Sequence, residues 1–257
     1  MHPALHLPLA MLAAFFAGAI NSVAGGGTLI SFPALLALGL PSIAANATST
    51  VAIWPGSIGS MWGFRREIRA TSPRYRWLAI PCMLGGVIGA LLLRLTPGAL
   101  FDKLVPFLIL FATILFTLQA PVQKRLQLAA HGDAPRGAAW IAGAALAQFA
   151  VGIYGGYFGA GMSIMLLSVL AFMGFEDILT MDALTSLFSF FVNGVASGIF
   201  AALHMVVWPY VFGMMAAALF GGYAAAGVAR RLGRTLVRRF VIGVGFTIAI
   251  VLFIKML

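Results

Sequence analysis

No charged residue occurs between Met1 and Phe64, and this run constrains the fold more than any other feature of the chain. About 20 apolar residues cross a bilayer as a helix, so a run of this length allows roughly three crossings. The whole chain is 9% charged and 62% hydrophobic, whereas about a quarter of the residues of soluble domains are charged. A soluble core of this size needs a charged shell, which this composition does not supply. We therefore predict an all-α polytopic membrane protein.

Further charge-free segments set the expected number of helices. They are 77–93, 104–123, 137–175, 183–229 and 240–254. The two longest segments each allow two short spans, and the others hold one span each. Together with the first run they predict about 8–10 membrane-crossing or re-entrant helices and leave no room for a soluble domain. The N-terminus has no basic stretch before its apolar run, so we expect no signal peptide.

The net charge of +10 comes from basic residues that are concentrated in three short stretches between apolar segments. These stretches hold Arg65, Arg66, Arg69, Arg74, Arg76, Lys124, Arg125, Arg136, Arg230, Arg231, Arg234, Arg238 and Arg239. Basic loops beside membrane helices mark the cytoplasmic face. The charge pattern therefore predicts topology and contact with lipid headgroups, and not nucleic-acid binding.

The chain also repeats itself. Three pairs of segments correspond in the same order and at nearly the same offset: Gly18–Gly27 with Gly152–Gly161, Thr48–Ser49 with Thr185–Ser186, and Gly85–Arg94 with Gly221–Arg230. We predict two related halves, a first transmembrane repeat at 1–118 and a second at 137–257, joined by a cytoplasmic linker at 119–136.

The basic loops also indicate how the two halves are oriented. The linker and the loop at 230–239 are both predicted to be cytoplasmic, so an even number of crossings must separate them. This holds if 137–175 is a hairpin that turns near 159–161, and the equivalent first hairpin then turns at 25–27. Each half has five crossings, and an odd number makes the halves inverted repeats, as in many secondary transporters. Both termini are then expected outside the cytoplasm.

The two glycine-rich turns are the first candidate for a binding site. Irregular backbone at membrane depth survives only where protein, water or a ligand takes its hydrogen bonds. A helix that starts after such a turn directs its N–H groups at the ligand, which favours an anion. The candidates are Gly25, Gly26, Gly27, Thr28, Gly159, Ala160 and Gly161. The alternative is that glycines only allow close helix packing, which is the interpretation that we favour for Gly85, Gly86, Gly89, Gly221 and Gly222.

Short polar side chains that follow the turns are the second candidate. Hydroxyls and amides can bind an oxyanion without the desolvation cost of a buried charge. In the first half these residues are Asn46, Thr48, Ser49 and Thr50, and in the second half Thr185, Ser186, Ser189 and Asn193. Helix capping or bonding between helices is the alternative role.

Asp182 is the one acidic residue that we place inside the membrane, and Glu176 and Asp177 are expected at the mouth of the same loop. An intramembrane carboxylate is a candidate proton carrier. Asp182 also precedes an apolar segment, so it is equally a candidate N-cap of a helix. His204 is expected in a turn on the extracytoplasmic side.

Several functions are not supported by any motif. No His, Cys and carboxylate set has metal-ligand spacing, and we expect no cofactor. No P-loop is present, because Gly25–Thr28 lacks the lysine of such a loop, and no hydrolase elbow occurs. The single Cys82 excludes an intramolecular disulfide and is expected to be an inert core residue. We therefore do not expect an enzyme.

The segments 24–33, Leu38–Pro41 and Ala45–Ser49 resemble the sulfite exporter TauE/SafE family, also called the TSUP permeases. In both, a glycine-rich turn leads to a proline, a short Leu-rich segment and an Ala-x-x-Thr-Ser-like stretch, with a degenerate copy in the second half. The second copy here has Gly-Ala-Gly in its turn and Leu167 in place of the proline.

The resemblance implies a multi-pass permease of the bacterial inner membrane for small sulfur-containing anions such as sulfite, sulfonates or sulfoacetate. The family includes importers and exporters. The expected mechanism is alternating access, and the alternative is a passive anion channel of the same fold.

Overall fold

The computed structural model describes residues 5–23, 26–129, 138–175, 177–232 and 234–256, and within them the chain is helical without strands. The first part contains α1 (His6–Val23), α2 (Thr28–Ala37), α3 (Ser42–Gly63), α4 (Arg65–Ala70), α5 (Pro73–Arg76), α6 (Ala79–Leu95) and α7 (Gly98–Ala129). The second part contains α8 (Ala138–Tyr157), α9 (Met162–Phe172), α10 (Ile178–Ala202), α11 (Trp208–Leu232) and α12 (Arg234–Met256). The all-α prediction is confirmed for these residues.

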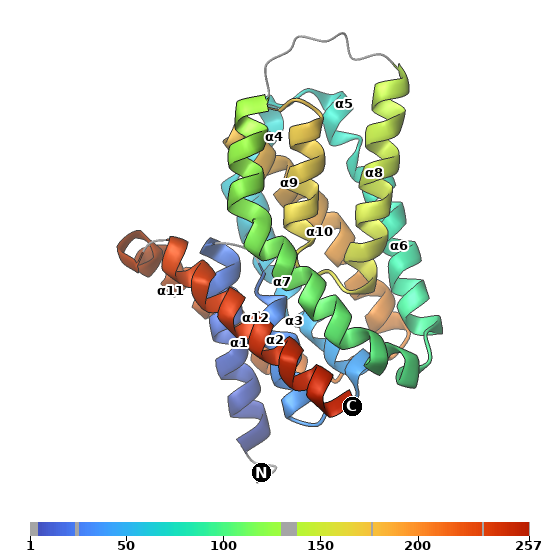
Figure 1. Cartoon of the computed structure of the whole chain (residues 1–257), viewed down its shortest axis with the longest axis vertical. Coiled ribbons are helices and arrows are strands. Elements are labelled where there is room, and N and C mark those ends of the chain that lie inside the picture. Colours follow the sequence, from blue (N-terminus) through green and yellow to red (C-terminus); the bar gives the residue numbers. More distant parts are fainter. Residues whose placement is uncertain (1–4, 24–25, 130–137, 176, 233, 257) are drawn as a thin grey trace.

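Two helical hairpins enter the molecule from opposite ends. In Figure 1, α1 runs from the N-terminal end to the middle and α2 returns to that end, whereas α8 and α9 do the same from the other end. The 10 residues of α2 and the 11 of α9 span about 15 Å each, half of a bilayer core of about 30 Å. The predicted hairpins are present, and their returning arms are half-length helices instead of full crossings.

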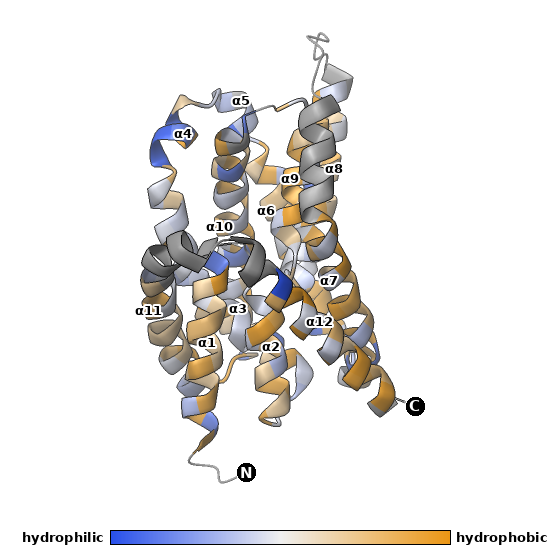
Figure 2. Ribbon diagram, turned by 60° about the vertical axis from the view of Figure 1, so that its left-hand side comes forward, coloured by the Kyte–Doolittle hydropathy of each residue, from blue (hydrophilic) through white to orange (hydrophobic). Residues whose placement is uncertain are grey.

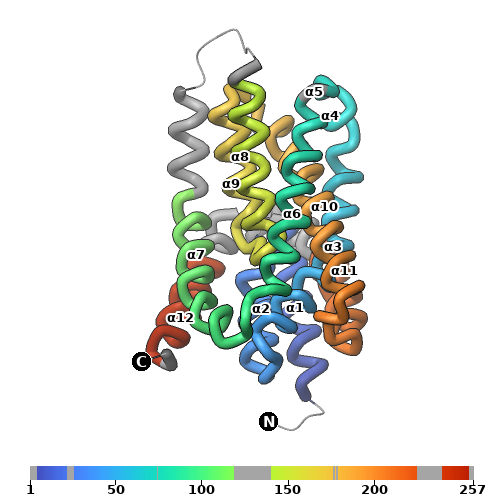
Figure 3. The backbone as a smooth tube through the Cα atoms, turned by 90° about the vertical axis from the view of Figure 1, so that its right-hand side faces the viewer, coloured from blue at the N-terminus to red at the C-terminus, as the bar shows by residue number. Residues whose placement is uncertain are grey.

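The longer helices run between the two ends of the molecule, as the tube in Figure 3 shows for α3, α6 and α10. Two helical stretches, Gly98–Leu118 and Leu179–Ala202, are long and apolar enough to cross a membrane. Ala79–Leu95 and Arg239–Ile254 are also apolar but shorter. The predicted apolar segments therefore form helices, and the two longer apolar stretches, of 21 and 24 residues, match the length of a span.

The half-length helices α2 and α9 end in the same way. Gly39 and Gly174 both have positive φ, at 87° and 75°. The amide of Leu40 bonds to the carbonyl of Leu35, and that of Phe175 bonds to the carbonyl of Leu170. This is the Schellman end, in which a left-handed residue lets the chain turn back and satisfies the last carbonyls.

The outer surface is apolar over most of its length. Large exposed side chains include Leu12, Phe16, Leu84, Ile88, Phe107, Phe111 and Phe220, and Figure 2 shows hydrophobic residues along the outer helices and hydrophilic ones on α4 at one end. Soluble monomers rarely expose contiguous apolar patches of more than a few hundred Å². Such a surface suits contact with lipid.

Tryptophans mark the end of the molecule that carries α4 and α5. Trp62 and Trp77 are about two-thirds exposed on either side of these basic helices. The Arg65 guanidinium lies 5.3 Å from the centre of a Trp62 ring. Trp side chains collect at membrane–water interfaces, so this end has the features of an interface.

Two helix pairs cross at very short distance through glycines. A Cβ atom built on Gly85 or Gly89 of α6 would overlap a carbonyl of α8, at Phe149 or Ile153. On the other side of the molecule, a Cβ on Gly221 of α11 would overlap the carbonyl of Phe15 in α1. Small residues let membrane helices approach in this way.

The packing interpretation of these glycines is thus confirmed. It also holds for Gly86, where a Cβ would lie 3.1 Å from Val192 Cγ1. Gly222 would make only ordinary contact, 3.6 Å from the Gly18 carbonyl oxygen. The expected core position of Cys82 is confirmed as well, because it is fully buried and its carbonyl lies against Gly152.

We expect Gly152→Ala to lower the free energy of unfolding by about 1–3 kcal/mol, because its methyl group would meet backbone that cannot move aside. The matched control is Gly143→Ala on the same helix, where a Cβ meets nothing within 4 Å. It should raise stability by up to about 1 kcal/mol through helix propensity. Thermal unfolding of the purified variants in detergent measures both effects, and equal behaviour of the two variants would contradict the close crossing.

Candidate functional site

The two hairpin turns are breaks between helices in the middle of the molecule. Gly26, Gly159 and Gly161 have φ of 87°, 76° and 78°, in the left-handed region that other residues rarely adopt. Gly27 lies so close to α1 that a Cβ would overlap the Ala17 carbonyl. Ala160 is 1% exposed. Glycine is therefore required at these breaks by backbone shape and by contact with protein.

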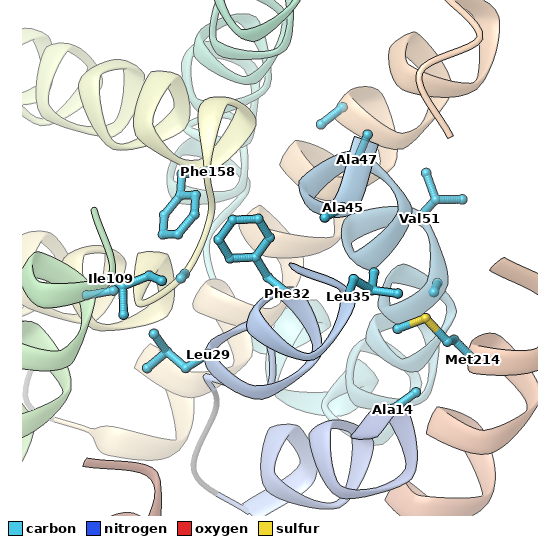
Figure 4. Packing of buried hydrophobic residues seen from close by; sticks show 14 of the residues in the cluster. Ala14, Leu29, Phe32, Leu35, Ala45, Ala47, Val51, Ile109, Phe158 and Met214 are labelled. Carbon is cyan, nitrogen blue, oxygen red and sulfur yellow. The ribbon is translucent and has the colours of Figure 1, made fainter. Parts of the chain in front are cut away.

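The two breaks lie close to one another. On α7, Ala112 faces Gly161 and Phe116 faces Gly26, and these two residues are one helical turn apart. The rings of Phe32 on α2 and Phe158 at the second break stand edge to face, with centroids 5.4 Å apart. Figure 4 shows both rings in the central cluster of buried residues, which also contains Leu29, Leu35 and Ile109.

Helices α2 and α9 both begin at these breaks, so their N-termini lie in the middle of the molecule. The N-terminus of a helix carries about half a positive charge from its aligned peptide dipoles. These two ends contribute positive potential at the breaks, while the C-termini of α1 and α8, which end there too, contribute negative potential. The surrounding apolar residues strengthen such fields because they exclude water.

Side chains hold the backbone of the breaks in place. The Tyr154 hydroxyl donates to the carbonyl of Ala160 at 2.6 Å, and Asn46 Nδ2 donates to the carbonyl of Tyr157 at 3.0 Å. At the first break, the amide of Gly27 donates to Asn21 Oδ1 at 3.3 Å. The breaks are therefore held by bonds within the protein. The sequence had left three kinds of partner open: protein, water or a ligand.

The polar residues of α3 have separate roles. The Ser49 hydroxyl lies 2.7 Å from that of Ser31, which itself reaches the carbonyl of Gly27, so Ser49 supports the first break. Asn46 supports the second break and keeps a buried Oδ1 without a partner among the described residues. Thr48 instead accepts a bond from the amide of Val207 at 3.0 Å, ahead of α11 and away from both breaks. Thr50 bonds back to the carbonyl of Asn46.

The polar residues of α10 recur every fourth position along one face: Thr185, Ser189, Asn193 and Ser197. Asn193 Oδ1 would lie 3.8 Å from a Cβ on Gly159, which places Asn193 beside the second break. Thr185 is two turns, or about 12 Å, further along the helix. Ser186 is half-buried near Thr185.

The buried hydroxyls of Thr185, Ser189 and Ser197 have no hydrogen-bond partner among the described residues. Leaving a buried polar group unsatisfied costs about 1–3 kcal/mol. These groups are thus available to a ligand or to water.

The structure brings Gly26, Gly27, Asn46, Ser49 and the second break together with Asn193, and it leaves Thr48, Thr185 and Ser186 apart from them. Thr28 is the half-buried first residue of α2, and Gly25 lies outside the described residues. Sequence reasoning missed Gln148, which is fully buried on α8. Its signal was a lone amide within the long charge-free segment.

The N-cap of α10 is Asp177, so the capping role considered for Asp182 is wrong. Asp177 accepts bonds from the amides of Leu179 and Thr180, at 3.2 and 2.9 Å. The hydroxyl of Thr180 donates a further bond, which is the main cause of the lowered pKa of this carboxyl. The helix begins at Ile178, earlier than the charge-free segment indicated, and Asp182 is half-buried in its second turn.

His204 is exposed with φ of 55° in the turn after α10, so the expected turn is confirmed and its extracytoplasmic side stays a prediction. Glu176 lies outside the described residues. Within the described part of the chain, no three His, Cys, Asp or Glu side chains are grouped as metal ligands.

The family profile described as "Sulfite exporter TauE/SafE" matches residues 10–252. A "Probable membrane transporter protein" of Haemophilus influenzae is 31% identical over 90% of this chain and 88% of its own. "Probable membrane transporter protein ORF9" of Sinorhizobium sp is 29% identical over 95% and 91%, and "Probable membrane transporter protein YfcA" of Escherichia coli K12 is 26% identical over 93% and 86%. No solved structure matches the chain significantly. The chain therefore belongs to the TauE/SafE sulfite exporter family of membrane transporters.

Proposed function

We propose that this protein is a multi-pass permease of the bacterial inner membrane that binds a small sulfur-containing anion where the two helix breaks meet. The sulfite, sulfonate or sulfoacetate class is the substrate. The observation that carries this proposal is the meeting of two helix N-termini at the breaks, with Phe32 and Phe158 in contact between them. The family description supports the choice of a sulfur anion.

The chemistry of the site agrees with an anion of this kind. The helix ends supply positive potential, and the side chain beside the second break is the neutral amide of Asn193. Neutral donors can bind an oxyanion without burying a full positive charge. Gly25, Gly26, Gly27, Thr28, Gly159, Ala160 and Gly161 remain the proposed backbone of the site.

We further propose that the halves 1–118 and 137–257 are inverted repeats and work by alternating access. The opposed hairpins, the matching ends at Gly39 and Gly174, and the corresponding glycine crossings of α1 with α11 and of α6 with α8 support this. Rocking of one half against the other exposes the breaks to each side in turn. Such a transporter gives saturable flux, whereas a passive anion channel does not.

For binding, we expect Asn193→Leu to weaken affinity for the transported anion at least tenfold, because it removes the amide beside Gly159 and keeps a similar volume. Thr48→Val is the control: it removes the acceptor of the Val207 amide, so stability should fall while affinity stays. Binding of radiolabelled sulfite, sulfoacetate, taurine and sulfate to the purified proteins is the measurement. Wild-type affinity of Asn193→Leu for the transported anion would refute this site. Gly26→Val is a weaker probe, since its Cβ would meet the Phe116 ring.

For topology, we propose that the basic α4–α5 segment, the linker 119–136 and the loop 230–239 are cytoplasmic. Both termini are proposed to lie outside the cytoplasm. Ser72, between α4 and α5, and His204, in the turn between α10 and α11, are both exposed. The α4–α5 segment and the turn after α10 lie at opposite ends of the molecule (Figure 1). In a Cys82→Ala background, a membrane-impermeant maleimide added to intact cells should label His204→Cys and leave Ser72→Cys unlabelled. The reverse pattern would overturn the proposed orientation.

For energy coupling, we propose Asp182 as the proton carrier, because it lies within α10 and Asp177 already provides the cap. Asp182→Asn should abolish the dependence of uptake on a pH gradient while anion binding persists. Uptake into proteoliposomes with and without a pH gradient tests this. Unchanged pH coupling in the variant would remove Asp182 from the mechanism.

A further inference from the structure

Gln148 on α8 is the buried polar side chain whose environment fits a structural role least well. It is 0% exposed, and neither its amide nitrogen nor its amide oxygen has a hydrogen-bond partner among the described residues. In folded proteins, most buried polar side-chain atoms are paired, and an exception calls for an explanation.

The face of α8 that carries Gln148 packs into the protein. Ala144, Val151 and Gly155 lie on the same face, three or four residues apart, and all are buried. Ala144 and Val151 belong to a second apolar cluster with Leu184, Leu187, Phe188 and Val192 of α10. Gln148 thus places an amide among apolar side chains, where a leucine or methionine would fit without loss of hydrogen bonds.

The register of α8 and α10 brings Gln148 to the level of Thr185. A Cβ on Gly155 would lie 2.9 Å from Val192 Cγ1, so the two helices touch there. Both helices run from the same end of the molecule toward the middle. Gln148 lies seven residues before Gly155 on α8, and Thr185 lies seven residues before Val192 on α10. Seven residues are two helical turns, or about 10 Å, so each residue lies on the same face as its reference residue.

Further polar groups without a partner among the described residues lie along α10, between the level of Gln148 and the second break. These are the buried hydroxyls of Thr185 and Ser189, and Asn193 follows beside the second break. Helix α10 contacts the basic helix α4, which lies at the end of the molecule from which α10 starts. The polar face of α10 therefore leads from the break toward the end that carries α4 and α5.

We propose that Gln148, Thr185 and Ser189 form a second binding site for the anion, which we call the Gln148 site, between the helix breaks and the α4–α5 end. The amide and the hydroxyls donate hydrogen bonds to oxyanion oxygens as the ion passes from the breaks. The anion class rests on the proposed function, whereas the existence of a polar, anion-accessible site at Gln148 does not.

The first test replaces Gln148 with methionine, which has a similar shape and no hydrogen-bonding group to satisfy. Gln148→Met should raise the unfolding temperature and weaken binding or uptake of the transported anion at least tenfold. Leu166→Met, in the same apolar cluster, is the control and should change neither. Wild-type affinity and uptake in Gln148→Met would overturn the proposal. A loss of folded protein would also overturn it, because it would show that the amide is a structural group.

The second test needs no known substrate. In the Cys82→Ala background, Gln148→Cys should react with a negatively charged methanethiosulfonate, and Leu166→Cys should not. Failure of Gln148→Cys to react, while the exposed Ser72→Cys reacts in detergent, would overturn the site. If the wild type binds none of sulfite, sulfoacetate, taurine and sulfate but Gln148→Cys reacts, the proposed substrate class fails and the Gln148 site stands.

Discussion

Backbone N–H and C=O groups at membrane depth must find hydrogen-bond partners within the protein. The middle of this molecule depends on how the two helix breaks satisfy that requirement. At the second break, the Tyr154 hydroxyl binds the Ala160 carbonyl and Asn46 binds the Tyr157 carbonyl. The second of these bonds joins the two halves of the chain, since Asn46 belongs to α3 and Tyr157 ends α8. Because of these bonds, the second break is stable without a ligand. A binding site needs this stability, since it must stay folded after its ligand leaves.

The close helix crossings fix where the breaks lie. Carbonyls of α8 rest against Gly85 and Gly89 of α6, and the equivalent contact of α1 is with Gly221 of α11. Each hairpin is thus held through its first arm by a helix from the other half, while its second arm is a short helix that starts at the break. Because both second arms start at a break, both of their N-termini lie in the middle of the molecule.

Features that depend on local composition could be predicted from the sequence. The helices, the hairpin turns and the packing glycines follow from segment length, charge and small residues. Roles that depend on distant partners could not be predicted: Thr48 binds Val207, far along the chain, and Gln148 is buried without a hydrogen-bond partner among the described residues. The capping alternative for Asp182 was wrong because α10 begins at Ile178, with Asp177 as its cap, before the charge-free segment from which the helix start was predicted.

The polar side chains of the two halves differ in a way that bears on transport. In the first half, Ser49 and Thr48 are paired within the protein, so they act as part of the scaffold. In the second half, the hydroxyls of Thr185, Ser189 and Ser197 stay available among the described residues. A transporter must bind its substrate and let it go, and several weak sites in series serve this better than one strong site. Neutral hydroxyls on a helix would meet that need for the proposed anion, because each contributes a modest hydrogen bond and none would hold it as a buried cation would.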